Sequence, residues 1–387
     1  MTAPSGPLFD QRLAPRLPRH GRNGLVFAAI KGRPSMNDRN ERQRRRTTQS
    51  ATIRDVAALA GVSPMTVSRV INRETTVKSE TKALVDAAIR DLNYAPNPAA
   101  RSLAGSAPFR IGLLYDNPST GYLSEFLVGA LDESSRTGAQ VVIEKCAEPE
   151  LAGATLTRLL KTGVDGLILP APLCESLTVL AEVKKAGAAA VAVAPGMASA
   201  DMATIRIDNQ AAAFELAQHL LALGHKRFGI IKGHPNQTVS QQRLDGFLAA
   251  LKAAGVPDDN VRIEQGYFTY RSGLEAAERL LGEDDRPSAI FAGNDDMAAA
   301  TAGVAHRMGL DVPEDVSIVG FDDTSIAANI WPALTTVHQP IAAMARAAVD
   351  LVLEEIRRKR GKAGEPRQLM HPHTLIVRDS TGPAPEG

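Results

Sequence analysis

The sequence predicts an all-α N-terminal head followed by an α/β core made of two parallel-sheet subdomains. Two observations support this fold class. Helix-capping signals follow one another closely in residues 51–95, whereas short β-rich runs alternate with amphipathic helices from Phe109 onward. The chain has 387 residues, of which 44% are hydrophobic, so it is too long for one ordinary domain and has ample core material.

We expect four segments along the chain. Residues 1–50 are rich in Pro, Arg and Gly without apolar periodicity, which predicts a disordered basic extension. Met36 stands before a more conventional beginning, so a translation start there is one hypothesis. The head is expected at 51–95, a hinge helix and linker at 96–108, and the core at 109–382.

The first two helices of the head have clear start and stop signals. Thr52 and Asp55 have the spacing of a capping box at the start of TIRDVAALA, and Gly61 ends that helix. Ser63 is expected to cap the second helix, with Pro64 at the first helical position, where a missing N–H does no harm.

Two more helices are predicted before the core. Ser79 is expected to cap a third head helix, SETKALVDAAIRDLNY. In the linker, Asn97 as cap, Pro98 at the first position and Gly105 as stop predict one short helix.

The core is predicted to contain eight strands in two runs of four, which suggests two similar subdomains. Helices such as AAAFELAQHLLALGH separate the strands, and this alternation favours parallel sheets with crossover helices. Ligands of open α/β sheets bind beyond the carboxyl ends of the strands. Many residues at these ends are polar and suit a hydroxylated ligand. The predicted strands are RIGLLYD, AQVVIEK, VDGLILP, AAAVAVA, RFGIIKG, RIEQGYF, SAIFAGND and VSIVGFDD.

The charge distribution is asymmetric. Residues 1–107 carry 18 Lys and Arg against 8 Asp and Glu, whereas residues 108–387 carry 26 against 35. A basic head on an acidic body indicates a head that meets a polyanion such as nucleic acid. The alternative is a solvated tail, because much of this charge lies in NDRNERQRRR.

The first two head helices and the glycine turn between them predict a helix-turn-helix. Three residues at the start of the second helix are expected to face base edges in the major groove: Pro64, Met65 and Thr66. Spacings of three and four predict a buried face of Val67, Val70 and Ile71. The exposed or flanking positions are Ser68, Arg69 and Asn72. Arg69 suits a guanine edge or a phosphate. The alternative is a three-helix cap that binds no ligand.

These head residues and several core motifs closely resemble the lactose-repressor (LacI/GalR-type) family of bacterial transcriptional regulators. The resemblance runs from residue 52 to about residue 380, through LLALGHKRFGIIKG, RLDGF, FAGNDDMAAA, DVPEDVSIVGFDDT and PALTTVHQP. It implies a core of periplasmic-binding-protein type that binds a small effector, usually a sugar or a nucleobase. The N-subdomain would then comprise about 109–207 and 338–371, and the C-subdomain about 208–337 and 372–382.

The resemblance assigns DNA contacts to the head and hinge. The family's base-reading pair falls on Pro64 and Met65, which leaves apolar contact with thymine methyl groups as their direct readout. Arg69 matches a base-contacting arginine. Leu103 matches a hinge leucine wedged into the minor groove, although a linker leucine packed on the core is the alternative. The positions at which the family contacts phosphates fall on Thr52, Ser63, Thr66, Asn72, Tyr94 and Asn97. Ser68 and Ala100 complete the expected DNA-binding set.

The resemblance also assigns an effector site. In sugar-responsive members, an arginine, an aromatic, an asparagine and an aspartate line the cleft, and they match Arg243, Phe268, Asn294 and Asp322. Their carboxylate, amide and guanidinium suit vicinal hydroxyls, and an aromatic ring stacks on a sugar's C–H face. Asp116 and Asn117, at the end of the first strand, are expected to close the other wall. The alternative places Phe268 in the core, Arg243 on a surface helix and the polar pair in turns.

One departure from the family concerns the effector. Several relatives end the fourth strand with an acidic residue, whereas this sequence reads VAVAPGM with Pro195 at that point. The change removes one hydroxyl acceptor. A sugar remains the favoured effector, with a purine as the alternative.

We therefore expect a sequence-specific DNA-binding regulator, namely a repressor of carbohydrate-utilisation genes that a sugar-type effector releases from a palindromic operator. A purine- or nucleoside-responsive regulator is the alternative within the family. A sugar-binding transport protein would share the core, but it would need a signal peptide and would not use residues 52–105. An enzyme is not expected, because no P-loop, Gly-x-Ser-x-Gly motif or metal-ligand cluster occurs and the carboxylate pairs 295/296 and 322/323 have no partner base.

Several features bound the remaining predictions. Cys146 and Cys174 give no disulfide framework, which fits a cytoplasmic, nucleoid-associated protein, and no apolar run reaches the roughly 18 residues of a membrane span. No leucine heptad follows TLIVRDSTGPAPEG, so a homodimer is expected. His371 and His373 on a predicted strand lack a third ligand, so no metal and no cofactor is expected.

Overall fold

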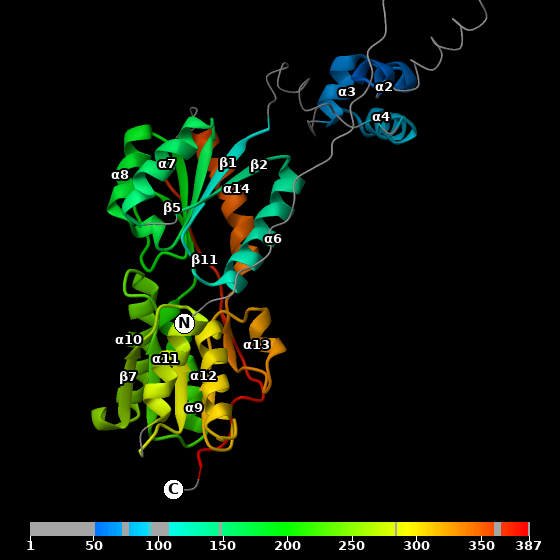
Figure 1. Ribbon diagram of the computed structural model, residues 1–387. Helices are drawn as coiled ribbons and strands as arrows, with labels where there is room; N and C mark the ends of the chain where they lie inside the picture. Colours follow the sequence, from blue (N-terminus) through cyan, green and yellow to red (C-terminus); the bar gives the residue numbers. More distant parts are fainter. Residues whose placement is uncertain are drawn as a thin grey trace, which may run out of the picture. The chain divides into compact units, whose positions relative to one another are not determined.

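In the computed structural model, the described residues are 51–71, 77–92, 94, 108–146, 149–282, 285–359 and 365–385. The chain divides into two compact units, Met1–Asn97 and Pro98–Gly387 (Figure 1). The linker helix predicted from Asn97 to Gly105 lies outside the described residues.

The first unit holds three short helices, α2 (Ile53–Ala60), α3 (Pro64–Ile71) and α4 (Ser79–Asp91). They pack around Val56, Val67 and Val85, each fully buried. The predicted capping box opens α2: the Thr52 side chain accepts from the Asp55 backbone, while Thr52 N donates to the Asp55 carboxylate over 2.8 Å. Gly61 then ends α2 with φ at 66°, a left-handed conformation that favours glycine.

The starts of α3 and α4 differ in how well the sequence predicted them. Ser63 Oγ accepts from Thr66 N over 3.2 Å, which confirms Ser63 as the cap in front of Pro64. The prediction for α4 was wrong, because Ser79 is its first helical residue and Lys78 occupies the N-cap position without a side-chain cap. The reason is that Lys78 already accepts the first intrahelical bond, from Lys82 N over 3.0 Å.

The second unit begins with a lobe, here called the N-lobe, built on a parallel six-stranded sheet of order β11-β5-β4-β3-β1-β2. Helices α6 and α14 cover one face and α7 and α8 the other (Figure 1). Along β3, Ile168 packs toward α6 and α14, whereas Leu167 packs toward α7 and α8. The strands are β1 (Arg110–Tyr115), β2 (Gln140–Lys145), β3 (Gly166–Pro170), β4 (Ala189–Val193), β5 (Ala203–Arg206) and β11 (Gln368–Met370). The helices are α6 (Thr120–Thr137), η1 (Pro149–Leu151), α7 (Ala152–Lys161), η2 (Leu173–Glu175), α8 (Leu177–Ala186) and α14 (Ile341–Lys359).

The second lobe, here called the C-lobe, is built on a parallel four-stranded sheet of order β7-β6-β8-β9. Along β6, Ile230 packs with Phe247 of α10, and the next residue, Ile231, packs with Ala276 of α11 on the opposite face. The strands are β6 (Phe228–Lys232), β7 (Val261–Gln265), β8 (Ala289–Ala292) and β9 (Ser317–Val319). The helices are α9 (Asn209–Ala222), α10 (Thr238–Ala253), η3 (Asp258–Asn260), α11 (Tyr270–Leu281), α12 (Asp295–Arg307) and α13 (Ser325–Asn329).

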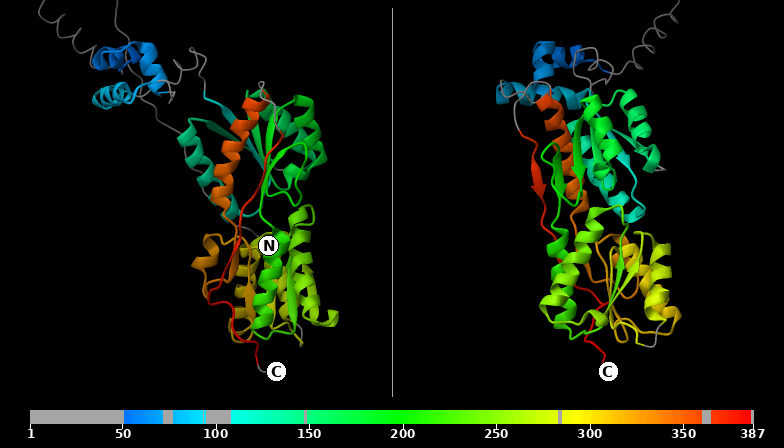
Figure 2. Two further views of the ribbon diagram at one scale, coloured as in Figure 1. Left: turned by 180° about the vertical axis from the view of Figure 1, so that it is seen from behind. Right: turned by 90° about the vertical axis from the view of Figure 1, so that its left-hand side faces the viewer.

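The two lobes lie end to end, and the chain passes between them around 207–208, 339–340 and 371–373 (Figure 2). Beside the last two passages, β10 (Thr336–His338) pairs antiparallel with β12 (Thr374–Ile376). All eight predicted strands are present and both large sheets are parallel, as the alternation of strands and helices predicted. The sequence did not predict β5, β10, β11 or β12, each of which has three or four residues.

His371 and His373 are not on a strand, contrary to the prediction, because they lie in the passage between β11 and β12. Pro372 between them has no N–H for a sheet ladder. His371 N donates to Arg206 O over 2.8 Å, and His373 Nε2 lies 3.2 Å from Glu215 Oε2. Within the described ranges, no group of three or more His, Cys, Asp or Glu residues is placed to hold a metal ion. None of the helices described here is both long and apolar enough to cross a bilayer.

Candidate functional site

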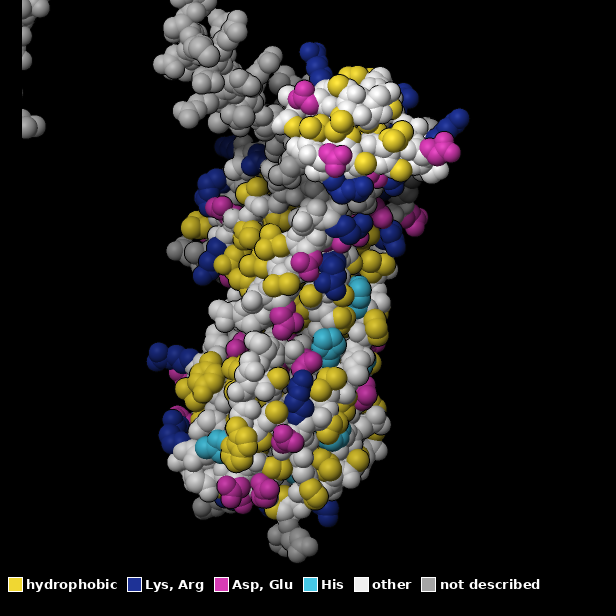
Figure 3. Space-filling model, turned by 90° about the vertical axis from the view of Figure 1, so that its right-hand side faces the viewer, with side chains coloured by type: hydrophobic (Ala, Val, Ile, Leu, Met, Phe, Trp, Pro, Cys, Tyr) yellow, Lys and Arg dark blue, Asp and Glu magenta, His cyan; other side chains and the backbone are white. Residues whose placement is uncertain are grey.

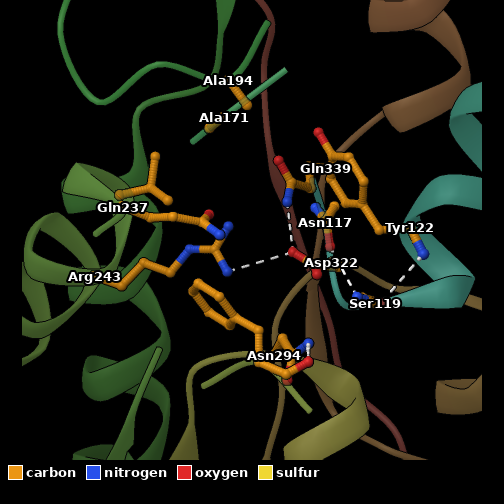
Figure 4. A pocket seen from close by; sticks show the side chains of 12 residues that line it. Asn117, Ser119, Tyr122, Ala171, Ala194, Gln237, Arg243, Asn294, Asp322 and Gln339 are labelled. Atoms are coloured by element: carbon orange, nitrogen blue, oxygen red, sulfur yellow. Dashed lines mark hydrogen bonds and ion pairs between the residues drawn. The ribbon is translucent and has the colours of Figure 1, made fainter. Parts of the chain in front are cut away.

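A pocket lies between the two lobes, beyond the carboxyl ends of strands from both sheets (Figure 4). This is the place where open α/β sheets bind ligands. The N-lobe contributes residues that follow β1, β3 and β4, and the C-lobe contributes residues of α10 and those that follow β7, β8 and β9. The lining is Asn117, Ser119, Tyr122, Ala171, Ala194, Gln237, Val239, Arg243, Phe268, Asn294, Asp322 and Gln339.

The structure brings together five of the six residues that the sequence assigned to an effector: Asn117, Arg243, Phe268, Asn294 and Asp322. The sixth, Asp116, does not line the pocket. Burial raises the pKa of its carboxyl group, while His234 and Lys145 act to lower it. His234 belongs to the loop after β6, so one of the groups that act on the Asp116 carboxyl belongs to the C-lobe.

A buried ion pair stands at the centre of the lining. Arg243 Nη1 lies 3.4 Å from Asp322 Oδ1, and each side chain is 7% exposed. The guanidinium also donates to Gly293 O over 2.7 Å and, through Nε, to Asn209 Oδ1 over 2.9 Å. Its Cζ lies 3.6 Å from the centroid of the Phe321 ring, within the range of a cation–π contact.

Burial raises the pKa of Asp322 to about 6, against the opposing effects of Arg243 and of the hydrogen bond that Gln339 donates. Burial also lowers the pKa of Arg243, with Asp322 opposing it. The two charges therefore compensate each other at a place where neither is well solvated.

The backbone of the pocket is strained at three of its lining residues. Among the described non-glycine residues, a positive φ occurs at Ala194 (54°), Phe268 (59°), Asp322 (110°) and Asp323 (57°). The first three line the pocket and follow β4, β7 and β9. Such conformations cost on the order of 1–3 kcal/mol each and gather at functional sites, where the surrounding structure holds them.

Phe268 illustrates how the surrounding structure holds one of these residues. A Cβ on Gly233 would lie 1.9 Å from Phe268 Cζ, so only glycine at the end of β6 leaves room for the ring. Asn294 Nδ2 donates to Phe268 O over 3.2 Å, and its Oδ1 caps α12 by accepting from Met297 N over 3.0 Å. Asn294 is therefore both a helix cap and a pocket residue.

The carboxylate of Asp295 is not part of the pocket lining and forms hydrogen bonds within the protein. Asp295 is fully buried, and its carboxylate accepts from Thr336 Oγ1 over 2.6 Å and from Thr324 N over 2.7 Å. Burial, reinforced by the charge of Asp322, raises its pKa well above the ordinary value. These bonds fix the start of α12 against the segments that carry Asp322 and β10, so the Asp295/Asp296 pair does not form part of the pocket lining.

Seven lining residues were not predicted: Ser119, Tyr122, Ala171, Ala194, Gln237, Val239 and Gln339. Tyr122 lies on α6 and Val239 on α10, so no strand-end rule pointed to them. Gln339 could have been found, because it lies within the PALTTVHQP motif that carries the family resemblance. Ala194, rather than the neighbouring Pro195, represents the fourth strand in the lining.

The free space in the pocket is about 30 Å³. Ligand pockets typically hold roughly 300–1,000 Å³. A sugar or a base therefore enters only if side chains or lobes move.

The second candidate site is α3 of the head. Pro64, Met65 and Arg69 are exposed, with 64% of the Met65 side chain accessible, whereas Val67 and Val70 are buried as predicted. Ile71, also predicted to be buried, is half-buried. The remaining described members of the expected DNA-binding set are exposed (Thr52, Ser63) or half-buried (Thr66, Ser68, Tyr94). Asn72, Asn97, Ala100 and Leu103 lie outside the described residues.

The core surface does not share the excess of basic residues found in residues 1–107. On the face shown in Figure 3, acidic and basic side chains of the core are interspersed rather than gathered into one charged patch. Helix α6 exposes two apolar side chains, Val128 (55%) and Leu131 (56%).

Comparison with known families gives two matches. The family described as bacterial regulatory proteins, lacI family, matches residues 52–97. The periplasmic binding protein-like domain matches residues 217–381. The first match covers the three-helix head, and the second covers the C-lobe from the second half of α9 onward, together with α14, β11 and β12.

Individual relatives span nearly the same length. The HTH-type transcriptional repressor PurR of Klebsiella pneumoniae (strain 342) is 34% identical over 334 residues, which are 84% of this chain and 95% of the relative. PurR of Escherichia coli O1:K1 / APEC is 35% identical over 346 residues, which are 87% of this chain and 98% of the relative.

Two solved structures resemble this one over almost their whole length. A complex of the transcriptional regulator CelR with cellobiose gives a TM-score of 0.65 at 30% identity, covering 85% of this chain and 99% of that one. The lac repressor dimer bound to operator and the anti-inducer ONPF gives a TM-score of 0.65 at 28% identity, and the match covers 86% of this chain and 100% of that one.

Proposed function

The chain belongs to the lacI family of bacterial regulatory proteins, and from that premise we propose how it reads DNA and which effector controls it. It is a DNA-binding transcriptional repressor whose partners are operator DNA and a small-molecule effector. The contacts with DNA, the class of effector and the direction of the response are our proposals.

For DNA, we propose that α3 enters the major groove of a palindromic operator. Pro64 and Met65 then meet thymine methyl groups, and Arg69 pairs with a guanine. The exposure of all three side chains on one short helix supports this assignment. Contacts to phosphate and sugar come from Thr52, Ser63, Thr66, Ser68, Asn72, Tyr94 and Asn97, and minor-groove contacts come from Ala100 and Leu103.

For the effector, we propose a sugar. The observation that carries this proposal is the buried Arg243–Asp322 pair beside the Phe268 ring. Each hydroxyl of a sugar both donates and accepts, so two neighbouring hydroxyls satisfy the carboxylate and the guanidinium together. The ring supplies an apolar face for the sugar's C–H groups. The similarity to the CelR–cellobiose complex agrees with this class.

A purine is the second candidate. Four amide side chains line the pocket, namely Asn117, Gln237, Asn294 and Gln339, and amides pair well with the donor and acceptor edges of a base. Tyr122 and Phe268 offer two aromatic rings beside it. The relatives named PurR favour this class.

A thermal-shift screen of the full chain against sugars, nucleobases and nucleosides separates the two candidates, because a ligand that binds the folded state raises its melting temperature. Stabilisation by one or a few sugars, with none by bases, supports the first proposal. Stabilisation by bases alone overturns it in favour of the second.

We further propose that the effector releases the protein from DNA, so that carbohydrate-utilisation genes are expressed when their substrate is present. The protein acts as a homodimer, which presents two heads to the two half-sites of a palindrome. The exposed apolar pair Val128 and Leu131 on α6 is a surface that a second copy can cover. Sedimentation of the full chain tests the dimer.

A further inference from the structure

One carboxylate bridges the two lobes at the rim of the pocket. Glu175 ends η2 in the N-lobe. Its Oε1 accepts from Gly196 N of the same lobe over 2.7 Å, and its Oε2 accepts from Thr238 N over 3.1 Å. Thr238 is the first residue of α10 in the C-lobe. The same side chain is therefore bound to both lobes.

Helix α10 depends on this contact for its cap. Gln237 at its N-cap position makes no side-chain cap, whereas the C-lobe helices α9, α11 and α12 are capped by Asp208, Thr269 and Asn294. The first N–H groups of a helix have no partner within it, and the positive end of the helix dipole attracts an anion. Glu175 supplies both the acceptor and the negative charge, from the opposite lobe.

Two further observations place the lobes in tight contact here. Gln242 Nε2, one turn along α10, donates to Gly196 O over 2.6 Å. A Cβ on Gly196 would lie 2.5 Å from Thr238 Cβ, closer than side chains approach. The φ of Gly196 is outside the left-handed region, so its backbone conformation does not require a glycine. A glycine is needed at this position because a side chain would keep the lobes apart.

We propose that Glu175, Gly196 and Gln242 form a latch that holds the lobes closed without an effector. The latch adjoins Ala194 and Gln237 of the pocket lining, so it sets how often the pocket opens to admit a ligand. A ligand changes the function of such a protein only through unequal affinity for the open and closed forms. The strength of the latch fixes the starting point of that equilibrium, whichever class of effector binds.

Two variants weaken the latch by different physical means. Glu175→Gln removes the charge and presents an amide N–H₂ group to one of the two backbone donors. Gly196→Ala adds a methyl group that meets Thr238 across the rim. The matched controls lie in the same lobe: Glu150→Gln at an exposed glutamate, and Gly153→Ala, whose added methyl would meet nothing closer than 3.6 Å.

Hydrogen exchange of the full chain without ligand measures the latch directly. We expect peptides containing Thr238 and Gly196 to exchange about tenfold faster in both latch variants, because a hydrogen bond to a charged group is lost or held apart. Small-angle scattering should show a larger radius of gyration in both. The two controls should match the wild type in both measurements.

Protection of β8 (Ala289–Ala292), in the centre of the C-lobe sheet, separates opening of the lobes from unfolding. Faster exchange at the latch with β8 still protected supports the proposal. If one variant also loses protection at β8, Gln242→Ala replaces it as the second variant. Unchanged exchange at Thr238 in folded variants overturns the proposal.

Discussion

Arg243 and Asp322, both of the C-lobe, form an ion pair in the pocket, with 3.4 Å between Nη1 and Oδ1 and 7% of each side chain exposed. Breaking such a pair from one side leaves a buried charge without compensation, which typically costs about 3–5 kcal/mol. A ligand that enters the pocket must therefore offer both donors and acceptors. Hydroxyl groups do so in any orientation, which is the reason for our proposal of a sugar as the effector.

Asp322→Asn should abolish the response to the effector while leaving operator binding intact. The amide keeps the volume of the side chain and can still accept from Gln339, but it no longer carries the charge that pairs with Arg243. The measurement is operator affinity with and without the ligand found by thermal shift. Asp245→Asn, an exposed position two residues along α10 from Arg243, is the control and should respond as the wild type does. A response of Asp322→Asn at the same ligand concentration would exclude Asp322 from the site.

The stability of the core should depend on the charge of Asp322. Its folded pKa of about 6 is above the ordinary value of 3.8, so the folded state binds more protons than the unfolded state in the window between them. Stability from this group is therefore present at low pH and lost as pH rises from about 4 to about 6, by an amount on the order of 3 kcal/mol.

Urea unfolding at about pH 4.5 and about pH 7 checks this prediction, with Asp322→Asn as the reference. The wild type should lose more stability than the variant over that interval. Asp295 adds its own pH dependence in both proteins, but the charge of Asp322 helps to raise its pKa, so the difference between the two proteins reports the charge of Asp322 together with its effect on Asp295. Parallel losses in the two proteins would show that Asp322 is not the group responsible.

The order of helices and strands was predictable because local signals agree with the tertiary structure. The capping box at Thr52 and Asp55 and the turn at Gly61 formed as the sequence predicted. The Ser79 cap did not, because a backbone bond to Lys78 starts the helix one residue earlier, and no side-chain signal reports that. Strands as short as β5 and β11 exist only through pairing with residues distant in sequence, so their own residues carry too little pattern.

Most of the predicted pocket residues follow strands, where topology brings the ends of parallel strands together. Phe268 and Asp322 are examples, and both are held at a positive φ that sequence patterns do not predict for these residue types. Tyr122 was missed because it projects from α6 of the opposite lobe. Its position depends on how the lobes close, which is a property of the whole core rather than of any local segment.

Arg69→Ala should weaken operator binding by roughly 1–3 kcal/mol and relax the preference at one operator position, if Arg69 pairs with a guanine. Met65→Ala should cost less, because it loses only apolar contact. The measurement is affinity for a panel of operators with one base pair changed in each. A uniform loss across all sequences would instead make Arg69 a phosphate contact.

Binding to a selected palindrome should weaken steeply and linearly with salt on logarithmic axes, because each phosphate contact releases counterions. A random duplex should bind more weakly at every salt concentration. Fluorescence anisotropy with both duplexes measures the two slopes and their separation. Equal affinity for the two duplexes at moderate salt would contradict sequence-specific reading by α3.

Leu103→Ala should have the opposite pattern to Asp322→Asn: weaker operator binding with an unchanged response to the ligand in thermal shift. The hinge helix that the sequence predicts has about two turns, which is too short to be stable alone, so we expect its formation to depend on contacts with DNA and with the second copy. We proposed above that Leu103 contacts the minor groove, so its removal should weaken contact with the operator. Leu84→Ala, an exposed leucine of α4, is the matched control and should bind the operator normally. If Leu103→Ala also lost the thermal shift, the assignment of Leu103 to DNA contact alone would be wrong.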